Sequence, residues 1–322
     1  MVALAAVCAL RAGDGPPRPV LAQAESVASL GNPSAAIPAM RQEWEIYPVQ
    51  RLIVPAGRQL INVPILMYHY IQFADPRDKL GWNLSVNPWD FQAQLDWLAG
   101  NGYHPIDFND LRGYLQGWWD LPANPVVLTF DDGYRDFYTT AWPILREHRF
   151  KAVSYVVTGF LGGPNYLSAE MVRELDRGGV QIGSHTVGHV DLTKAGGGLW
   201  YQLAESRSYL EGLLGHPVVD FCYPSGKVSA YVANAVAAAG YQTATTTVYG
   251  TRHGWGDRYL WTRVRVSGGQ SLADFTRQLG PSEPTLSVTF NPVEDLPAGP
   301  PTTLPRIFPL LAPRVVALQP RS

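Results

Sequence analysis

Strand-like and helix-like segments alternate about seven times between residues 63 and 279. Short apolar runs predict buried strands at 63–69, 125–130, 151–157, 180–184, 218–223, 241–246 and 263–266. Helical spacing, capping residues and terminating glycines predict helices at 88–99, 108–116, 138–148, 168–177, 199–214, 229–239 and 271–279. This alternation indicates a parallel sheet covered by helices, as either a barrel or a doubly wound sheet.

The candidate polar residues follow directly after strands, at the end where a βα barrel carries its active site. We therefore favour an α/β fold of the irregular (β/α)7 TIM-like barrel type. The 322 residues, 46% of them hydrophobic, suffice for one large domain with tails or for two small domains. We place that domain at 61–280, after a leader or linker at 1–60 and before a Pro-rich tail at 281–322.

The N-terminal leader gives an irregular targeting signal. Residues 2–10 are apolar but lack the preceding basic residues of a signal peptide, while residues 20–24 resemble a small-x-small cleavage site. A signal segment and a disordered leader fit equally well, and we expect a secreted or cell-envelope location. No stretch of about 18 apolar residues predicts a membrane span. A net charge of -2 argues against general nucleic-acid binding, and we expect a monomer.

Two adjacent carboxylates, Asp131 and Asp132, end the predicted strand at 125–130. Because successive side chains point in different directions, one carboxylate can bind a metal while the other faces a water. Gly133 permits a tight turn directly afterwards. Taken alone, these three residues fit an ordinary helix-capping turn better than a site.

Two histidines four residues apart, His185 and His189, begin at the end of another predicted strand. A helical turn between them would let both imidazoles meet one ion, although a surface loop with incidental histidines has the same spacing. Together with one Asp they would leave metal positions open for water and substrate, as a catalytic site requires. The shared strand-end position of the two pairs favours a site over a turn.

Four motifs carry a resemblance to a known family. Residues 129–133 read Thr-Phe-Asp-Asp-Gly, 185–189 begin and end with His, 221–226 read Phe-Cys-Tyr-Pro-Ser-Gly, and 63–69 read Val-Pro-Ile-Leu-Met-Tyr-His. With these motifs in this order, the chain resembles the polysaccharide deacetylase family, the NodB-homology domain of carbohydrate esterase family four, over about residues 60–280. The stretch at 63–69 resembles the branch that deacetylates poly-N-acetylglucosamine.

This resemblance implies a one-metal N-deacetylase acting on an N-acetylated glycan. Asp132, His185 and His189 would hold one divalent ion, usually Zn²⁺, with Co²⁺, Ni²⁺ or Fe²⁺ as alternatives. Asp131 would be the general base that activates water, and the backbone N–H of Tyr223 would help to stabilise the oxyanion. A histidine acid would protonate the leaving amine, without which an amine does not depart.

Two departures from the family pattern leave roles to be filled. The chain has no histidine after His253, so the late acid histidine of many members is missing. His69 fits the acid role in the poly-N-acetylglucosamine branch, and His253 is the second candidate. The usual Arg beside the base is also missing from the third motif, and Arg263 is our candidate to supply that charge.

Two other functions remain open. An O-acetyl esterase acting on xylan-type polysaccharide, or a small cyclic amide hydrolase, would use the same metal site. A carbohydrate-binding member that had lost catalysis would not need Asp131, so the intact set of Asp131, Asp132, His185 and His189 speaks against it.

Overall fold

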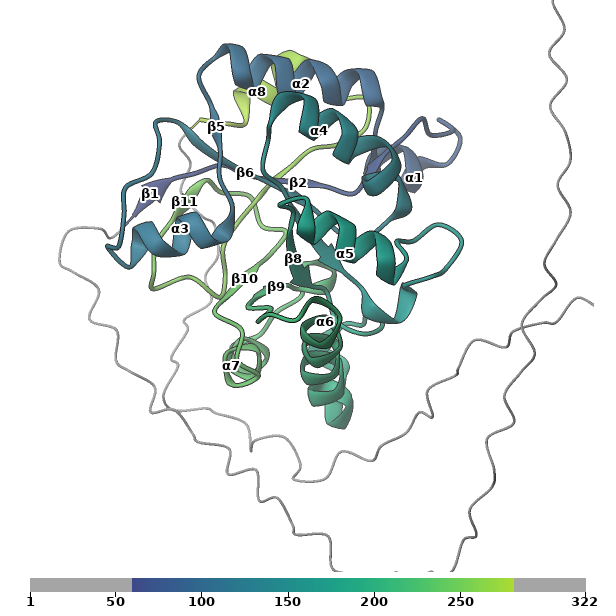
Figure 1. Ribbon diagram of the computed structural model, residues 1–322, viewed down its shortest axis with the longest axis vertical. Coiled ribbons are helices and arrows are strands. Elements are labelled where there is room, and N and C mark those ends of the chain that lie inside the picture. Colours follow the sequence, from purple (N-terminus) through teal and green to yellow (C-terminus); the bar gives the residue numbers. More distant parts are fainter. Residues whose placement is uncertain (1–59, 281–322) are drawn as a thin grey trace, which may run out of the picture. The chain divides into compact units, whose positions relative to one another are not determined.

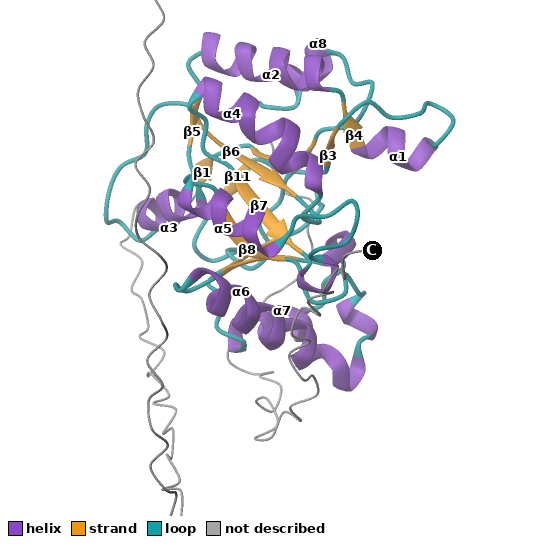
Figure 2. Cartoon of the chain, turned by 45° about the vertical axis from the view of Figure 1, so that its right-hand side comes forward, coloured by secondary structure: helices purple, strands orange, loops and turns teal. Residues whose placement is uncertain are grey.

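A computed structural model describes residues 60–280 (Figure 1). The predicted leader, apart from residue 60, and the predicted tail at 281–322 lie outside the described residues. Helices surround a central group of strands in both views (Figures 1 and 2). None of the described helices is both long enough and apolar enough to cross a membrane.

The central sheet is parallel and runs in the order β10-β9-β8-β7-β6-β2-β12. Its strands are β2 (Ile65–Tyr68), β6 (Pro125–Phe130), β7 (Val153–Val156), β8 (Gln181–Ser184), β9 (Asp220–Cys222), β10 (Thr243–Thr245) and β12 (Val264–Arg265). Each lies within a predicted strand, because short runs of buried apolar residues give a strong strand signal.

The stretch from Trp261 to β12 closes the sheet into a barrel. The Thr246 N–H donates to the carbonyl oxygen of Trp261 at 2.8 Å, which joins this stretch to the end of β10. Three residues later, Val264 pairs with Leu66 of β2. The final strand position is therefore divided, its first half pairing with β10 and its second half with β2. The predicted irregular (β/α)7 barrel is confirmed.

The helices that cover the barrel are α2 (Pro88–Gly100), α3 (Phe108–Leu115), α4 (Trp142–His148), α5 (Ala169–Arg177), α6 (Ser206–Leu214), α7 (Ala230–Ala238) and α8 (Leu272–Arg277). Five of them begin at a side chain that accepts a backbone N–H: Asn87, Asp107, Ser168, Ser229 and Ser271. A π-helical turn precedes α4 at Phe137–Ala141 and α6 at Tyr201–Glu205. The apolar spacing did not predict these turns.

Several short elements were also not predicted from the sequence. They are α1 (Lys79–Leu84), β1 (Ile61–Asn62) paired with β11 (Arg252–His253), β3 (Tyr70–Ile71) paired with β4 (Ser85–Val86), and β5 (His104–Pro105) paired with β6. Two-residue strands are too short to show a periodic pattern.

Both faces of the barrel strands are apolar. Leu66 and Leu128 share one cluster with Phe91 and Leu95 of α2, whereas Ile65 and the other alternate residues share a second cluster around Trp261. Burial on both faces is typical of parallel sheets under helices. Polar side chains are therefore confined largely to the strand ends.

Candidate active site

The candidate residues gather at the carboxyl ends of the parallel strands. His69 follows β2, Asp131 and Asp132 follow β6, and His185 follows β8. Asp132 has a backbone φ of 72° and His189 has one of 52°, in the left-handed region that non-glycine residues rarely adopt. Such strained conformations cluster at functional sites, where the surrounding structure holds them in place.

Asp132, His185 and His189 fit a divalent metal ion. The Nε2 atoms of His185 and His189 lie 3.4 and 3.3 Å from Asp132 Oδ1. Tetrahedral ligands with metal bonds of about 2.1 Å stand about 3.3 to 3.5 Å apart, which matches both distances. Asp132 Oδ1 is also buried without a hydrogen-bond partner among the described residues. A cation between these three atoms would satisfy it.

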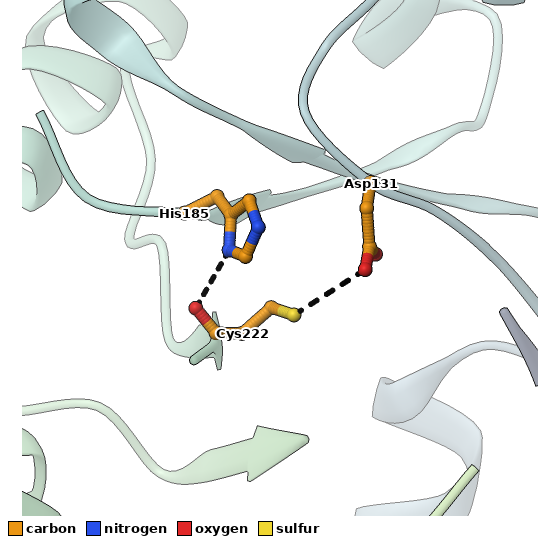
Figure 3. A group of neighbouring side chains, drawn as sticks. All are labelled: Asp131, His185 and Cys222. Atoms are coloured by element: carbon orange, nitrogen blue, oxygen red, sulfur yellow. Dashed lines mark hydrogen bonds between the residues drawn. The ribbon is translucent and has the colours of Figure 1, made fainter. Parts of the chain in front are cut away.

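The backbone around the site holds the two imidazoles in place. His185 Nδ1 lies 2.7 Å from the carbonyl oxygen of Cys222, so Nδ1 carries the proton and Nε2 keeps its lone pair for a metal (Figure 3). The loop before His189 is held by Gln202, whose Oε1 accepts the N–H groups of Val187 at 3.1 Å and Gly188 at 2.9 Å. Gln202 lies in the π-helical turn before α6, and the sequence gave no reason to single it out.

Asp131 makes a different set of contacts from Asp132. The two terminal nitrogens of Arg263 donate to the two carboxylate oxygens of Asp131, each at 2.8 Å. Arg263 also donates to the hydroxyl of Thr129 and to the carbonyl oxygen of Thr246, and its side chain is fully buried. Burial alone would raise the pKa of Asp131, but the Arg263 charge holds that pKa well below its usual range. The structure thus brings Arg263 to Asp131.

Cys222 is part of the site, which the sequence analysis missed. Its thiol lies 3.7 Å from Asp131 Oδ2 (Figure 3), and Arg263 donates to its sulfur at 3.2 Å. Asp131, His185 and Cys222 stand close enough together to hold an ion. The positive charge of Arg263 on both oxygens of Asp131 opposes a cation there, so we assign the metal to the Asp132 group instead.

The structure brings His69, rather than His253, to the carboxylates. His69 Nε2 lies 4.0 Å from Asp131 Oδ2, and its Nδ1 is buried without a hydrogen-bond partner among the described residues. His253 Nε2 lies 3.0 Å from the carbonyl oxygen of Val63, at the opposite end of β2. Burial lowers the pKa of His253 to about 3. His253 therefore lies at the wrong end of the barrel for the acid role.

The role expected for the backbone N–H of Tyr223 needs correction. That N–H donates to the carbonyl oxygen of Thr245 at 3.1 Å, because the pairing between β9 and β10 continues one residue beyond β9. The Tyr223 hydroxyl donates to the carbonyl oxygen of Tyr259 at 3.0 Å. Both donors of Tyr223 are therefore used inside the fold, and the N–H is not free to bind an oxyanion.

A row of tyrosines lines one side of the site, and the sequence analysis did not identify it. The rings of Tyr70 and Tyr134 stack with centroids 3.7 Å apart, and Tyr134 stacks on Tyr166 at 5.2 Å. The charge of Asp132 acts on all three hydroxyls, which places them near the metal ligands. A row of aromatic rings is a surface on which sugar rings can stack.

Known proteins with similar sequences share this arrangement of motifs. The family model described as polysaccharide deacetylase matches residues 120–244. YxkH of Bacillus subtilis, which bears the name of the same family, is 31% identical over 219 residues, covering 66% of this chain and 75% of the relative. The poly-β-1,6-N-acetyl-D-glucosamine N-deacetylase of Escherichia coli is 34% identical over 119 residues, which are 32% of this chain but only 18% of that protein.

Solved structures show the same fold. The deacetylase PplD of Streptococcus pyogenes, determined in complex with acetate, aligns with a TM-score of 0.64 and 29% identity, over 69% of this chain and 99% of that one. A polysaccharide deacetylase of Bacillus cereus, BC0361, aligns with a TM-score of 0.61 and 28% identity, over 69% and 70% of the two chains. Since it is also similar to YxkH over three quarters of that relative's length, the chain belongs to the polysaccharide deacetylase family of hydrolases.

Proposed function

We propose that this deacetylase is a metal-dependent enzyme that removes N-acetyl groups from a polysaccharide containing N-acetylglucosamine. The observation that carries the proposal is the difference between the two adjacent carboxylates. Asp132 faces two imidazoles, whereas Asp131 is held by Arg263 beside His69. One carboxylate is thus placed to bind a cation, and the other to move a proton.

The metal site supports the first half of this proposal. Asp132, His185 and His189 would hold one divalent ion, and two nitrogens with one oxygen suit Zn²⁺ as well as Co²⁺, Ni²⁺ or Fe²⁺. We choose Zn²⁺ because three such ligands with open positions are typical of its catalytic sites. The bound ion supplies Lewis acidity toward a water and toward the acyl oxygen.

The remaining residues support a proton relay. A carboxylate whose pKa is lowered is a weak base, so Asp131 can take a proton only from a water that is itself acidified. Burial lowers the pKa of His69, so its imidazole is neutral at rest and free to receive that proton from Asp131. His69 then donates the proton to the sugar amine, which leaves with both electrons of the broken carbon–nitrogen bond.

The substrate class rests on the relatives and on the tyrosine row. The relatives in Escherichia coli and Staphylococcus aureus are named as poly-β-1,6-N-acetyl-D-glucosamine N-deacetylases. The stacked rings of Tyr70, Tyr134 and Tyr166 suit the apolar faces of pyranose rings. A polymer of this kind fits an enzyme that works outside the cytoplasm.

Acetate release from a panel of glycans tests the proposal. The panel is poly-β-1,6-N-acetylglucosamine, chitin oligomers, peptidoglycan glycan strands and acetylated xylan, each with and without chelator. We expect release from at least one N-acetylglucosamine polymer, loss of release with chelator, and recovery with one equivalent of Zn²⁺. Release from xylan alone would instead make the protein an O-acetyl esterase, and release that survives full chelation would contradict the metal role.

A further inference from the structure

A polar cavity of about 320 Å³ lies beside the candidate active site. It is lined by Tyr70, Gln72, Arg135, Asp136, Thr139, Pro164 and Asn165. These residues come from the segments that follow β2, β6 and β7, so the cavity opens on the same end of the barrel as the metal ligands. Its volume is at the lower end of the range for small-molecule sites.

Tyr70 forms the boundary between the cavity and the active site. It directly follows His69, and its ring stacks on Tyr134. Burial raises the pKa of Tyr70, and the negative charges of Asp132 and Asp136 add to that rise. The ring therefore has a metal ligand on one side and a carboxyl group of the cavity on the other.

Hydrogen bonds hold the walls of the cavity in position. The N–H of Arg135 donates to the carbonyl oxygen of Asn165 at 2.9 Å, which joins the segments after β6 and β7. The N–H of Ile71 donates to the carboxylate of Asp136, which joins the segments after β2 and β6. A preformed cavity does not have to be ordered when a ligand binds.

Two polar groups in these walls are poorly satisfied by the protein itself. Arg135 Nε is buried and has no hydrogen-bond partner among the described residues. Burial raises the pKa of the Asp136 carboxyl to about 6, so its charged form is disfavoured at neutral pH. Groups of this kind oppose folding and are commonly kept for binding.

We infer that this cavity is a subsite for a second sugar residue, the neighbour of the residue that loses its acetyl group. The inference rests on the proposed function, because it requires a glycan in the adjacent active site. Amide, hydroxyl, guanidinium and carboxyl groups beside one aromatic ring suit a pyranose with many hydroxyl groups. An apolar ligand would leave these groups unpaired.

Chain-length dependence of turnover tests the subsite. The variants are Asn165→Ala and Thr139→Val, and the control is Thr276→Val in α8. Both threonines bond a carbonyl oxygen of the preceding helical turn, Thr139 that of Arg135 at 3.4 Å and Thr276 that of Ala273 at 3.1 Å. The measured quantity is kcat/KM for the N-acetylglucosamine trimer divided by kcat/KM for the monomer. We expect this ratio to fall about tenfold when both cavity substitutions are combined, and to stay at the wild-type value in the control.

A binding measurement separates failure of the subsite from failure of the proposed function. Calorimetric titration of the trimer into an Asp131→Asn background needs no turnover. Affinity for the trimer should fall about tenfold when the two cavity substitutions are added, while Thr276→Val leaves it unchanged. Equal trimer affinities or an unaltered kcat/KM ratio would overturn the subsite even if acetate is released. Absence of acetate release with trimer binding that depends on Asn165 would overturn the function and leave the subsite standing.

Discussion

Two buried arginine–aspartate pairs lie at opposite ends of the same barrel. Arg263 meets both oxygens of Asp131 beyond the carboxyl end of β6. At the other end, Arg112 of α3 meets one oxygen of Asp220, the first residue of β9. Both pairs are almost fully buried, so burial alone does not distinguish them.

The two carboxyl groups nevertheless respond in opposite directions. Burial would raise both pKa values, but the bidentate Arg263 lowers the pKa of Asp131, whereas burial outweighs Arg112 and the pKa of Asp220 is raised. Thr243 and Gln181 also donate to Asp220, so its oxygens are taken up by the fold. Asp131 instead faces His69. The same pair of residue types is thus structural at one end of the barrel and, in our proposal, catalytic at the other.

The largest effect should come from breaking the two pairs separately. Arg263→Gln leaves Asp131 buried without its cation, which should lower the free energy of unfolding by about 3–5 kcal/mol and raise the pKa of the base. Arg112→Gln should destabilise the fold by a similar amount, but its folded molecules should keep their turnover. Urea melts and acetate release per folded molecule measure both. Equal losses of turnover in the two folded variants would remove the distinction.

The two buried histidines offer a second comparison between the ends. His69→Ala should lower kcat by about 10²- to 10⁴-fold, because the leaving amine loses its proton donor. His253→Ala at the far end should change the melting temperature but not kcat. Steady-state kinetics at saturating substrate checks this, with Zn²⁺ content showing that both variants remain loaded. Near-normal kcat in His69→Ala would mean that another group protonates the amine.

A smaller effect should follow from loosening the loop that carries His189. Gln202→Met keeps the side-chain length but removes the oxygen that accepts two N–H groups, and should weaken Zn²⁺ affinity about 10- to 100-fold. Gln202→Glu keeps an acceptor oxygen and should restore most of that affinity. Competition titration with a chromogenic chelator measures both variants. Wild-type affinity in Gln202→Met would show that the loop is held by other contacts.

The smallest effect concerns Asp136 and acts on stability. Burial raises its pKa to about 6 from 3.8, so the folded protein holds this proton more tightly than the unfolded chain. The resulting stabilisation is full below about pH 4 and is lost as the pH rises through about 6. Asp136→Asn should remove this loss, raising the free energy of unfolding at pH 7 by on the order of 2 kcal/mol. Urea melts from pH 4 to pH 8 test it, and an unchanged pH slope would contradict it.

The fold was largely predictable because each barrel strand is a short run buried on both faces. Closure was not predictable in detail, since residues 261–265 pair with β10 and then with β2, and no local pattern encodes a change of partner. The π-helical turns before α4 and α6 also escaped prediction, because an extra residue in one turn scarcely changes the apolar spacing.

The site was predictable where its residues lie within one motif, as Asp131 and Asp132 do. Contacts across the barrel could only be guessed at, because Arg263 stands 132 residues from Asp131 in the chain. Cys222 and Gln202 act partly through a backbone carbonyl and a side-chain amide, which carry no distinctive motif. The Tyr223 role was wrong because sequence does not show how far the pairing of β9 with β10 extends.

The most direct test of the division between the two carboxylates is the Zn²⁺ content and acetate release of Asp131→Asn. Asp220→Asn at the other end of the barrel is the matched control for loss of a buried carboxylate. We expect Asp131→Asn to bind one Zn²⁺ per chain and to lose at least about 10³-fold in kcat, because Asp132, His185 and His189 remain while the base is gone. Loss of the Zn²⁺ from Asp131→Asn, with the fold intact, would contradict the assignment.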